Sequence, residues 1–422
     1  MENKYDVIVV GGGSSGLMSA VCASRNGARV LLLEKNTNLG EKLKISGGGR
    51  CNITNNTVDI HKFLSNYGEN AKYLYSAFSQ FSMKDTFDYF ESRGLPLVTQ
   101  ARNRAFPHTE RALDVYKVFE RELKELGVVV KTNSPVKKIL KEGNHITGVV
   151  VDGVTYTATE YVFATGGVSH PKTGSTGDGF KWLTDLGHTV HKPTPSIVPL
   201  KVLEPWVADV SGVSLSFMKI TFFVDGKKAF SKIGKILFTH FGLSSPLILN
   251  CSKQVGDLLP TGDVTAVIDM YPDTDIGSLD KQLVKIFDNH KNKTFKNIIK
   301  EVTPEGMHAV ILDLLCHSGL DPESRFDINT KVHSITKEER RIIVDLLKGL
   351  TLTITGLMGF DRAVIADGGV PLKEIDTKTM RSLKIDNLFI TGDLLHVNRP
   401  SGGYSLQLCW TTGYVVGQNV GK

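Results

Sequence analysis

Residues 5–34, YDVIVVGGGSSGLMSAVCASRNGARVLLLE, decide the fold class of this 422-residue chain. The run from Tyr5 to Val10 is short, apolar and β-branched, which is typical of a buried parallel strand. Glycines follow it, helical spacing is expected over about residues 14–26, and a second apolar run at residues 28–33 ends at Glu34. This order predicts a βαβ unit at the start of the chain.

The glycines of this unit match G-x-G-x-x-G at Gly11, Gly13 and Gly16. Gly11 permits the tight turn, Gly13 lets a pyrophosphate approach the backbone, and Gly16 allows close packing of helix on strand. Glu34 follows Gly11 by 34 − 11 = 23 residues, where a carboxylate can accept hydrogen bonds from ribose hydroxyls. We therefore expect a dinucleotide to bind at this unit.

A second motif overlaps the same glycines. Residues 12–16 also fit G-x-S-x-G, the nucleophile elbow of α/β-hydrolases, with Ser14 as the nucleophile. Only a few residues precede the motif, so the earlier strand whose loop completes an oxyanion hole is missing. The hydrolase alternative also leaves Glu34 unexplained. We favour phosphate binding by the N–H groups at Ser14 and Ser15.

Glycine clusters recur far from this unit, and glycine makes up 41 of the 422 residues. Residues 40–55 read GEKLKISGGGRCNITN, in which three glycines precede Arg50. No ordinary helix or strand needs this arrangement. It predicts backbone held against a flat ring or a phosphate, with Arg50 supplying positive charge.

Three further segments complete the pattern of a two-part flavin-binding fold. Residues 164–167 and 391–393 each follow a predicted strand, and residues 402–404 open the last predicted helix. In such a fold they contact FAD in turn, with Asp393 on the ribityl hydroxyls. The positive end of the last helix would then face the N1–C2=O edge of the flavin.

These motifs resemble a family of FAD-dependent flavoproteins that includes aminoacetone oxidase-like and BaiN-type, 3-dehydro-bile-acid reductase-like NAD(P)/FAD-dependent oxidoreductases. The resemblance covers essentially the whole chain, including GGGSSGL at Gly11, RAFPHTERALDV at Arg104, ATGGVSHPKTGSTGDGF at Ala164, GKILFTHFGLSSP at Gly234 and TGDLLHVNRPSGGYSLQLCWTTGYVVG at Thr391. It implies an α/β fold: a Rossmann-like FAD-binding domain (a glutathione-reductase-like flavin fold) with an inserted β-barrel and a helical bundle. It also implies an FAD-dependent oxidoreductase that transfers a hydride between a small-molecule substrate and non-covalent FAD.

The domain boundaries follow from changes in composition. Short strands begin after Pro193 and Pro195, and helical spacing replaces them from about residue 277. We expect an FAD-binding domain at 1–195 and 350–422, a β-barrel-like substrate domain at 196–275, and a helical subdomain at 276–349. Thr336 and Glu339 predict a capping box at a helix start within the last of these.

The expected FAD contacts come from every segment described above. They are Gly11, Gly13, Ser14, Ser15, Gly16, Glu34, Lys35, Lys42, Ser46, Gly47, Gly48, Arg50, Cys51, Asn52, Val136, Ala164, Thr165, Gly166, Gly392, Asp393, Gly402, Gly403, Tyr404 and Ser405.

Candidates for proton transfer are fewer. His240 lies in FTHFGLSSP, which the family places toward the flavin, and Tyr404 is the other catalytic candidate. His108 and His170 are weaker candidates beside prolines. His188 and His191 are three residues apart without a carboxylate or cysteine to complete a metal site, so we expect them at the surface and expect no metal.

The resemblance does not imply the substrate, because the chain departs from the family where the substrate should lie. Lys235 stands where the family usually has Glu, and Ser245 where it has Gly. Asp393 replaces a Glu, and residues 396–401, HVNRPS, replace an acid-rich turn.

The amino-acid composition limits the remaining classes of function and partner. The net charge is 50 − 44 = +6 and no five basic residues are consecutive, so we expect no nucleic-acid partner. A flavin-dependent RNA-modifying enzyme and a non-catalytic flavin-binding regulator stay open as alternatives. Five cysteines without C-x-x-C, no signal peptide and no run of about 20 apolar residues predict a soluble cytoplasmic protein without a membrane partner. A single G-x-G-x-x-G leaves NAD(P)H as a candidate transient electron donor, with O₂ as an alternative partner.

Overall fold

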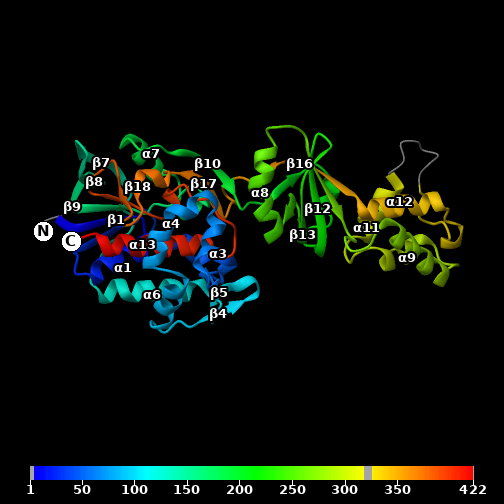
Figure 1. Cartoon of the computed structure of the whole chain (residues 1–422), viewed down its shortest axis with the longest axis horizontal. Helices are drawn as coiled ribbons and strands as arrows, with labels where there is room; N and C mark the ends of the chain where they lie inside the picture. The colour runs from blue at the N-terminus through cyan, green and yellow to red at the C-terminus, as the bar shows by residue number, and fades with distance from the viewer. Residues whose placement is uncertain (1–3, 318–325, 422) are drawn as a thin grey trace. The chain divides into compact units, whose positions relative to one another are not determined.

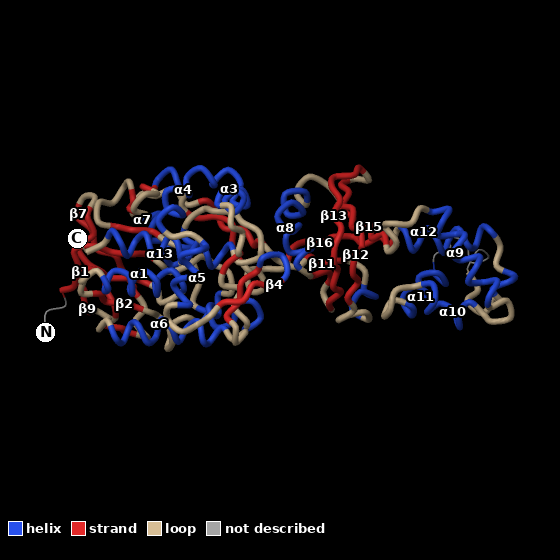
Figure 2. The backbone as a smooth tube through the Cα atoms, turned by 60° about the horizontal axis from the view of Figure 1, so that its bottom comes forward, coloured by secondary structure: helices blue, strands red, loops and turns tan. Residues whose placement is uncertain are grey.

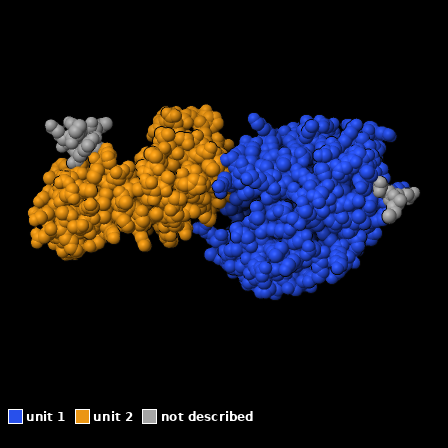
Figure 3. Space-filling model, turned by 180° about the vertical axis from the view of Figure 1, so that it is seen from behind, with its two compact units in different colours: residues 1–196, 359–422 blue, residues 197–358 orange. Residues whose placement is uncertain are grey.

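The computed structural model describes residues 4–317 and 326–421. The chain divides into two compact units, residues 1–196 with 359–422 and residues 197–358, which Figure 3 colours separately. Each unit has a hydrophobic core of its own. Within the described residues, no helix combines the length and the apolar character needed to cross a bilayer.

The first unit is built on a nine-stranded sheet in the order β18-β19-β20-β9-β1-β2-β6, with β7 and β8 joined to it through β9. The strands β20, β9, β1, β2 and β6 run parallel to one another. Their bounds are β1 (Lys4–Val10), β2 (Val30–Leu33), β6 (Val129–Lys131), β7 (Val136–Glu142), β8 (His145–Val151), β9 (Val154–Phe163), β18 (Ile375–Asp376), β19 (Arg381–Ser382) and β20 (Leu388–Ile390). Residues 7–10 of β1 are all buried, as expected for a strand covered on both faces.

Helices α1 (Ser14–Arg25) and α13 (Tyr404–Asn419) lie side by side, although they come from opposite ends of the chain (Figure 1). Glycines permit this close approach: a Cβ at Gly413 would lie 2.6 Å from the carbonyl oxygen of Ser15. The other α-helices of the unit are α2 (Glu41–Ile45), α3 (Ile60–Leu64), α4 (Ala71–Gln80), α5 (Met83–Glu91), α6 (Ala112–Glu125) and α7 (Asp178–Asp185).

Two small sheets complete the first unit. One has the order β3-β5-β4, from β3 (Thr54–Asn55), β5 (Arg104–Pro107) and β4 (Leu97–Gln100). The other pairs β10 (His191–Ser196) with β17 (Ile365–Gly369) in antiparallel fashion.

The second unit contains a closed barrel in the order β11-β14-β13-β12-β15-β16. Its strands are β11 (Leu200–Val202), β12 (Ser214–Val224), β13 (Lys227–Thr239), β14 (Gly242–Ser244), β15 (Val264–Asp269) and β16 (Leu350–Leu357). Its helices are α8 (Pro246–Leu258), α9 (Ile276–Asn289), α10 (Phe295–Val302), α11 (His308–His317) and α12 (Lys337–Lys348), with α9–α12 grouped beside the barrel in Figure 2. Residues 318–325 of the expected helical subdomain lie outside the described residues.

One predicted boundary is wrong. We assigned residues 350–422 to the FAD-binding domain, yet β16 pairs with β15 and β11 and so closes the barrel. The second part of the FAD unit therefore begins at residue 359. An apolar strand carries no local signal for which of two sheets it joins, because pairing partners are set by tertiary contacts. The predicted capping box is confirmed, since Thr336 accepts from the Glu339 N–H and Glu339 accepts from the Thr336 N–H.

The prediction that His188 lies at the surface is wrong. Its side chain is fully covered: Nδ1 lies 2.8 Å from Oε2 of Glu374, and Nε2 lies 2.8 Å from Oγ of Ser382. Burial lowers the pKa of His188, although the Glu374 carboxylate opposes that shift. His191, in contrast, is exposed as expected.

We expect Glu374→Gln to remove an acid-sensitive part of the stability of this unit. Burial alone would raise the pKa of Glu374, but hydrogen bonds from Thr189, His188 and Lys384 bring it to about 2, against 4.5 without these contacts. Because the folded pKa is depressed, this stabilisation is present above pH 4.5 and is lost as the pH falls toward 2. The shift corresponds to about 3 kcal/mol at neutral pH.

Urea unfolding of FAD-free wild type and Glu374→Gln at pH 7 and pH 3 measures this contribution. The stability difference between the two proteins should shrink on acidification. A difference of the same size at both pH values would contradict the assignment.

Candidate functional site

Four segments meet at one edge of the central sheet, because parallel strands bring their carboxyl ends together. Strand β1 ends before Gly11, β2 before Glu34, β9 before Ala164 and β20 before Thr391. Gly11, Glu34 and Ala164 are expected FAD contacts, and Gly392, the residue after Thr391, is another. The sheet therefore assembles distant sequence motifs into a single candidate cofactor site.

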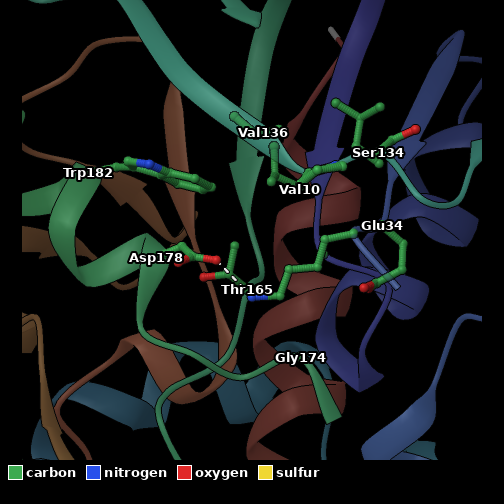
Figure 4. Close-up of a pocket in the computed structure, with 12 residues that line it drawn as sticks. Val10, Glu34, Ser134, Val136, Thr165, Gly174, Asp178 and Trp182 are labelled. Atoms are coloured by element: carbon green, nitrogen blue, oxygen red, sulfur yellow. Dashed lines mark hydrogen bonds and ion pairs between the residues drawn. The ribbon is translucent and has the colours of Figure 1, made fainter. Parts of the chain in front are cut away.

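A pocket opens at this edge, and Figure 4 shows Glu34 and Ser134 on one side of it, with Asp178 and Trp182 on the other. The Glu34 carboxylate is buried, and it accepts hydrogen bonds from the N–H groups of Gly12 and Asn36, each at 2.8 Å. Lys35 pairs with Asp178 at 2.7 Å. The pocket is lined by Val10, Gly11, Leu33, Glu34, Lys35, Ser134, Pro135, Val136, Thr165, Gly174, Asp178 and Trp182.

The residues of this pocket fit the adenosine end of FAD. Oγ1 of Thr165 is buried and has no hydrogen-bond partner among the described residues, a costly state that a polar ligand would relieve. The indole of Trp182 and the side chain of Val136 offer apolar surface for a base, while Glu34 offers acceptors for ribose hydroxyls.

The three motif glycines have different steric surroundings. A Cβ at Gly11 would lie 2.5 Å from the carbonyl oxygen of Ala164, and one at Gly16 only 1.9 Å from that of Gly11. A Cβ at Gly13, in contrast, would meet nothing within 4 Å. Gly11 and Gly16 thus permit close backbone packing, and Gly13 borders open space beside the first turn of α1, as a pyrophosphate site requires.

The segment from residue 40 to 55 contains several residues with left-handed backbone conformations. Gly47 and Gly48 have φ of 57° and 67°, and Cys51 has φ of 59°. Burial raises the pKa of the Cys51 thiol to about 12, so this thiol is neutral and a poor nucleophile. The guanidinium of Arg50 is paired with Glu110 at 2.5 Å and with Gln100 at 2.8 Å, so its charge is already matched within the protein.

A charged cluster lies where β20 ends, in the segment that includes η9 (Gly392–Leu394). Asp393 pairs with Arg399, whose side chain is 1% exposed. Lys42 is partly buried close to Asp393, and its Nζ lies 3.1 Å from Oγ of Ser169. Burial lowers the pKa of Lys42, while the Asp393 carboxylate opposes that shift.

The start of α13 is tied to the segment before β3. Gly403 has φ of 103°, and a Cβ there would lie 2.2 Å from the carbonyl carbon of Thr54. With its amide oxygen facing Gly403, Asn52 accepts a hydrogen bond from that N–H at 2.9 Å. Tyr404 packs against Phe63, and burial raises the pKa of its phenol.

The remaining predicted contacts lie in the same segments. Ser46 donates to the carbonyl of Leu43, Gly166 has φ of 71°, and Gly392 donates its N–H to Oγ1 of Thr412. Ser405 accepts a hydrogen bond from Arg399. Sequence reasoning missed Arg399, Ser169, Asp178 and Trp182, whose polar or aromatic side chains fit an ordinary surface loop or helix equally well.

The histidine candidates belong to different segments of the chain. His240 is exposed in the turn between β13 and β14 of the second unit, with its ring against Phe241. His170 has φ of 49°, and burial together with the nearby Lys42 lowers its pKa. His108 is exposed, and its Nδ1 lies 3.3 Å from the carbonyl oxygen of Pro96.

Comparison with known proteins accounts for this arrangement of motifs. The family described as HI0933-like protein Rossmann domain matches residues 5–419. The chain belongs to this HI0933-like family. Its relatives are FAD-dependent oxidoreductases, and the chain is an enzyme of this type with a Rossmann-like FAD-binding fold. Membership confirms the predicted fold class and sets the Ser14 hydrolase alternative aside.

Proteins that are similar to this chain are named for different activities. The 3-dehydro-bile acid delta(4,6)-reductase of Clostridium scindens is 28% identical over 418 residues, covering 97% of both chains. The ribosomal RNA dihydrouridine synthase of Escherichia coli is 25% identical over 417 residues, covering 99% of this chain and 98% of its own. An open flavocytochrome c3 fumarate reductase shares the fold with a TM-score of 0.54 at 18% identity, covering 99% of this chain and 78% of that one.

Proposed function

We propose that this enzyme reduces a carbon–carbon double bond conjugated to a carbonyl group in a small molecule. The alignment with a bile-acid reductase along 97% of both chains is the observation that carries the proposal. That relative's name describes reduction of double bonds in a 3-oxo substrate. Bound FAD would supply a two-electron carrier that exchanges a hydride with the substrate carbon.

We further propose that FAD is held without a covalent bond. The Cys51 and Cys409 thiols both have pKa values raised to about 12 by burial, which leaves them unreactive. The pyrophosphate would lie at Gly13 and the first turn of α1, the adenosine ribose at Glu34, and the ribityl chain beside Asp393. The first turn of α13 would place the positive end of its dipole toward the pyrimidine edge.

In this proposal the protein's own residues deliver a proton. Reduction of a conjugated double bond adds a hydride to one carbon and a proton to the other. His240 and Tyr404 are the proposed donors, and burial raises the pKa of the Tyr404 phenol, so it keeps its proton at neutral pH. NAD(P)H would reduce the flavin as a transient donor, because each reduction of the substrate consumes two electrons and the one complete G-x-G-x-x-G is assigned to FAD.

Anaerobic stopped-flow mixing tests the proposed reaction. The purified protein should be yellow and release FAD on heating, and NADH or NADPH should bleach its visible flavin absorbance. A 3-oxo-4-ene steroid should then restore the colour. Bleaching by amines, together with no recovery of colour on adding the enone, would replace the reductase proposal with an amine oxidase.

We expect His240→Asn to slow the recovery of colour by at least about tenfold, the lower part of the range for a general acid. FAD affinity should be unchanged. The exposed His333, on the same unit, offers a matched control as His333→Asn. If His240→Asn has an unchanged rate of colour recovery, or if the control loses as much of this rate, His240 does not take part in the reaction.

A second candidate function, uridine reduction in RNA, is favoured by the name of the E. coli relative. Lys291, Lys293, Lys296 and Lys300 are all exposed within ten residues of the second unit. Their charge would suit a phosphate backbone, although we expected no nucleic-acid partner. Binding to a ribosomal RNA fragment that weakens steeply with salt, and dihydrouridine detected by mass spectrometry, would favour this candidate.

A further inference from the structure

Arg399 occupies an unusual position for an arginine in a loop. Its guanidinium pairs with Asp393, its Nη1 donates to the carbonyl oxygen of Val397 at 2.6 Å, and its Nε donates to Oγ of Ser405 at 3.1 Å. All three nitrogens are therefore used. Burial of a charge is expensive unless it is paired and hydrogen-bonded, and these contacts satisfy that requirement.

The contacts of Arg399 join two parts of the candidate site. Asp393 lies three residues after the end of β20, at the carboxyl edge of the sheet, whereas Ser405 lies in the first turn of α13. A planar guanidinium holds both partners in a fixed relation, which a flexible ammonium group does not. Arg399 therefore sets the geometry of the turn between them.

The solvent exposure of the Asp393 and Arg399 side chains differs, and this difference gives the two residues different roles. The Asp393 side chain is 15% exposed and Oδ1 is its atom paired with Arg399, while the Arg399 side chain is 1% exposed. A ligand in the site can therefore reach the carboxylate but not the guanidinium. Arg399 acts on a ligand through Asp393 and the start of α13, not by touching it.

We propose that Arg399 is a positioning residue that orients Asp393 and the first turn of α13 to bind the polyhydroxyl chain and ring of FAD. The inference rests on the proposed FAD contact of Asp393. The proposal gives a role to Arg399 within residues 396–401, HVNRPS. This segment stands where the family usually has an acid-rich turn. Lys42, which lies close to Asp393 and is bonded to Ser169, supports the same carboxylate from another segment.

The test compares Arg399→Lys and Arg399→Met with wild type after FAD has been removed and titrated back. We expect the Kd for FAD to rise at least tenfold in Arg399→Met and less in Arg399→Lys. We also expect the visible spectrum and the midpoint potential of the bound flavin to change. Arg381→Met is the matched control, because Arg381 pairs with Glu160 at 2.7 Å in the same unit.

The control should lose thermal stability without a change in FAD affinity or flavin spectrum. Arg399 variants that lose stability but keep the affinity, spectrum and potential of wild type would overturn the proposal. Should Arg399→Met not fold, Arg399→Lys carries the same comparison, since it keeps the charge and alters only the geometry.

A double-mutant cycle tests whether Arg399 works through Asp393. In an Asp393→Asn background, Arg399→Lys should change the Kd for FAD by less than twofold, because the two residues act as a unit. Additive effects would overturn the positioning role. A wild-type protein that binds no FAD would instead refute the proposed function, so the two failures are distinguishable.

Discussion

Gly16→Ala is expected to yield a protein without bound FAD. A Cβ at this position would lie 1.9 Å from the carbonyl oxygen of Gly11 and 3.2 Å from Cβ of Ala164. The first turn of α1 would have to move away from the ends of β1 and β9, where the pyrophosphate would bind. Overpacking of this kind costs about 1–3 kcal/mol, occasionally more, and here the cost falls on the phosphate-binding loop itself.

Gly13→Ala separates the fold from cofactor binding. Its φ is −80° and a Cβ meets nothing within 4 Å, so the FAD-free protein should keep its melting temperature. The methyl group would nevertheless occupy space beside the proposed pyrophosphate. We expect FAD affinity to fall by about tenfold to hundredfold, equivalent to about 1–3 kcal/mol.

Gly417→Ala is the matched control for Gly16→Ala. Its Cβ would lie 2.3 Å from Cβ of Cys22, so it overpacks the same pair of helices at a point far along α13. This variant should melt earlier but bind FAD as wild type does. Isothermal titration of FAD into each apoprotein measures the difference, and equal affinities in Gly16→Ala and wild type would contradict the loop assignment.

The first strand, helix and second strand could be predicted from sequence because local signals determine them. Residues 7–10 are continuously apolar, and the structure has β1 there, followed by α1 at Ser14 and β2 up to Leu33. The position of Glu34 in the pocket follows from the same register. These features depend on residue spacing within one βαβ unit. The periodicity of apolar residues in the sequence predicts such local spacing.

Features that depend on contacts between distant segments could not be predicted. The His188 imidazole is buried by Glu374 and Ser382, which lie nearly two hundred residues away. In the sequence, Arg399 is compatible with an ordinary exposed loop. Only the folded turn shows that its guanidinium is buried. Strand β16 is a regular strand by pattern, yet its partners β15 and β11 decide which unit contains it.

Glu34→Ala is expected to weaken FAD binding by about 1.5–3 kcal/mol, the range for hydrogen bonds to a charged group. That loss corresponds to an increase of about 10- to 150-fold in the Kd for FAD. The carboxylate lines the pocket, and each of its oxygens accepts a backbone N–H while keeping a further lone pair for a ribose hydroxyl. Removing it also leaves the Gly12 and Asn36 N–H groups without these acceptors, so the apoprotein should lose stability as well.

Glu122→Ala distinguishes lost binding from lost stability. Glu122 is also a buried carboxylate of the first unit, paired with Arg25 and with Arg93, but it lies on α6 outside the pocket. Its removal should lower the melting temperature and leave the Kd for FAD unchanged. The measurement is the Kd for FAD, obtained by titrating FAD into both apoproteins below their melting temperatures. The assignment of Glu34 to the ribose fails if Glu34→Ala binds FAD as tightly as wild type. It also fails if Glu122→Ala loses as much affinity as Glu34→Ala.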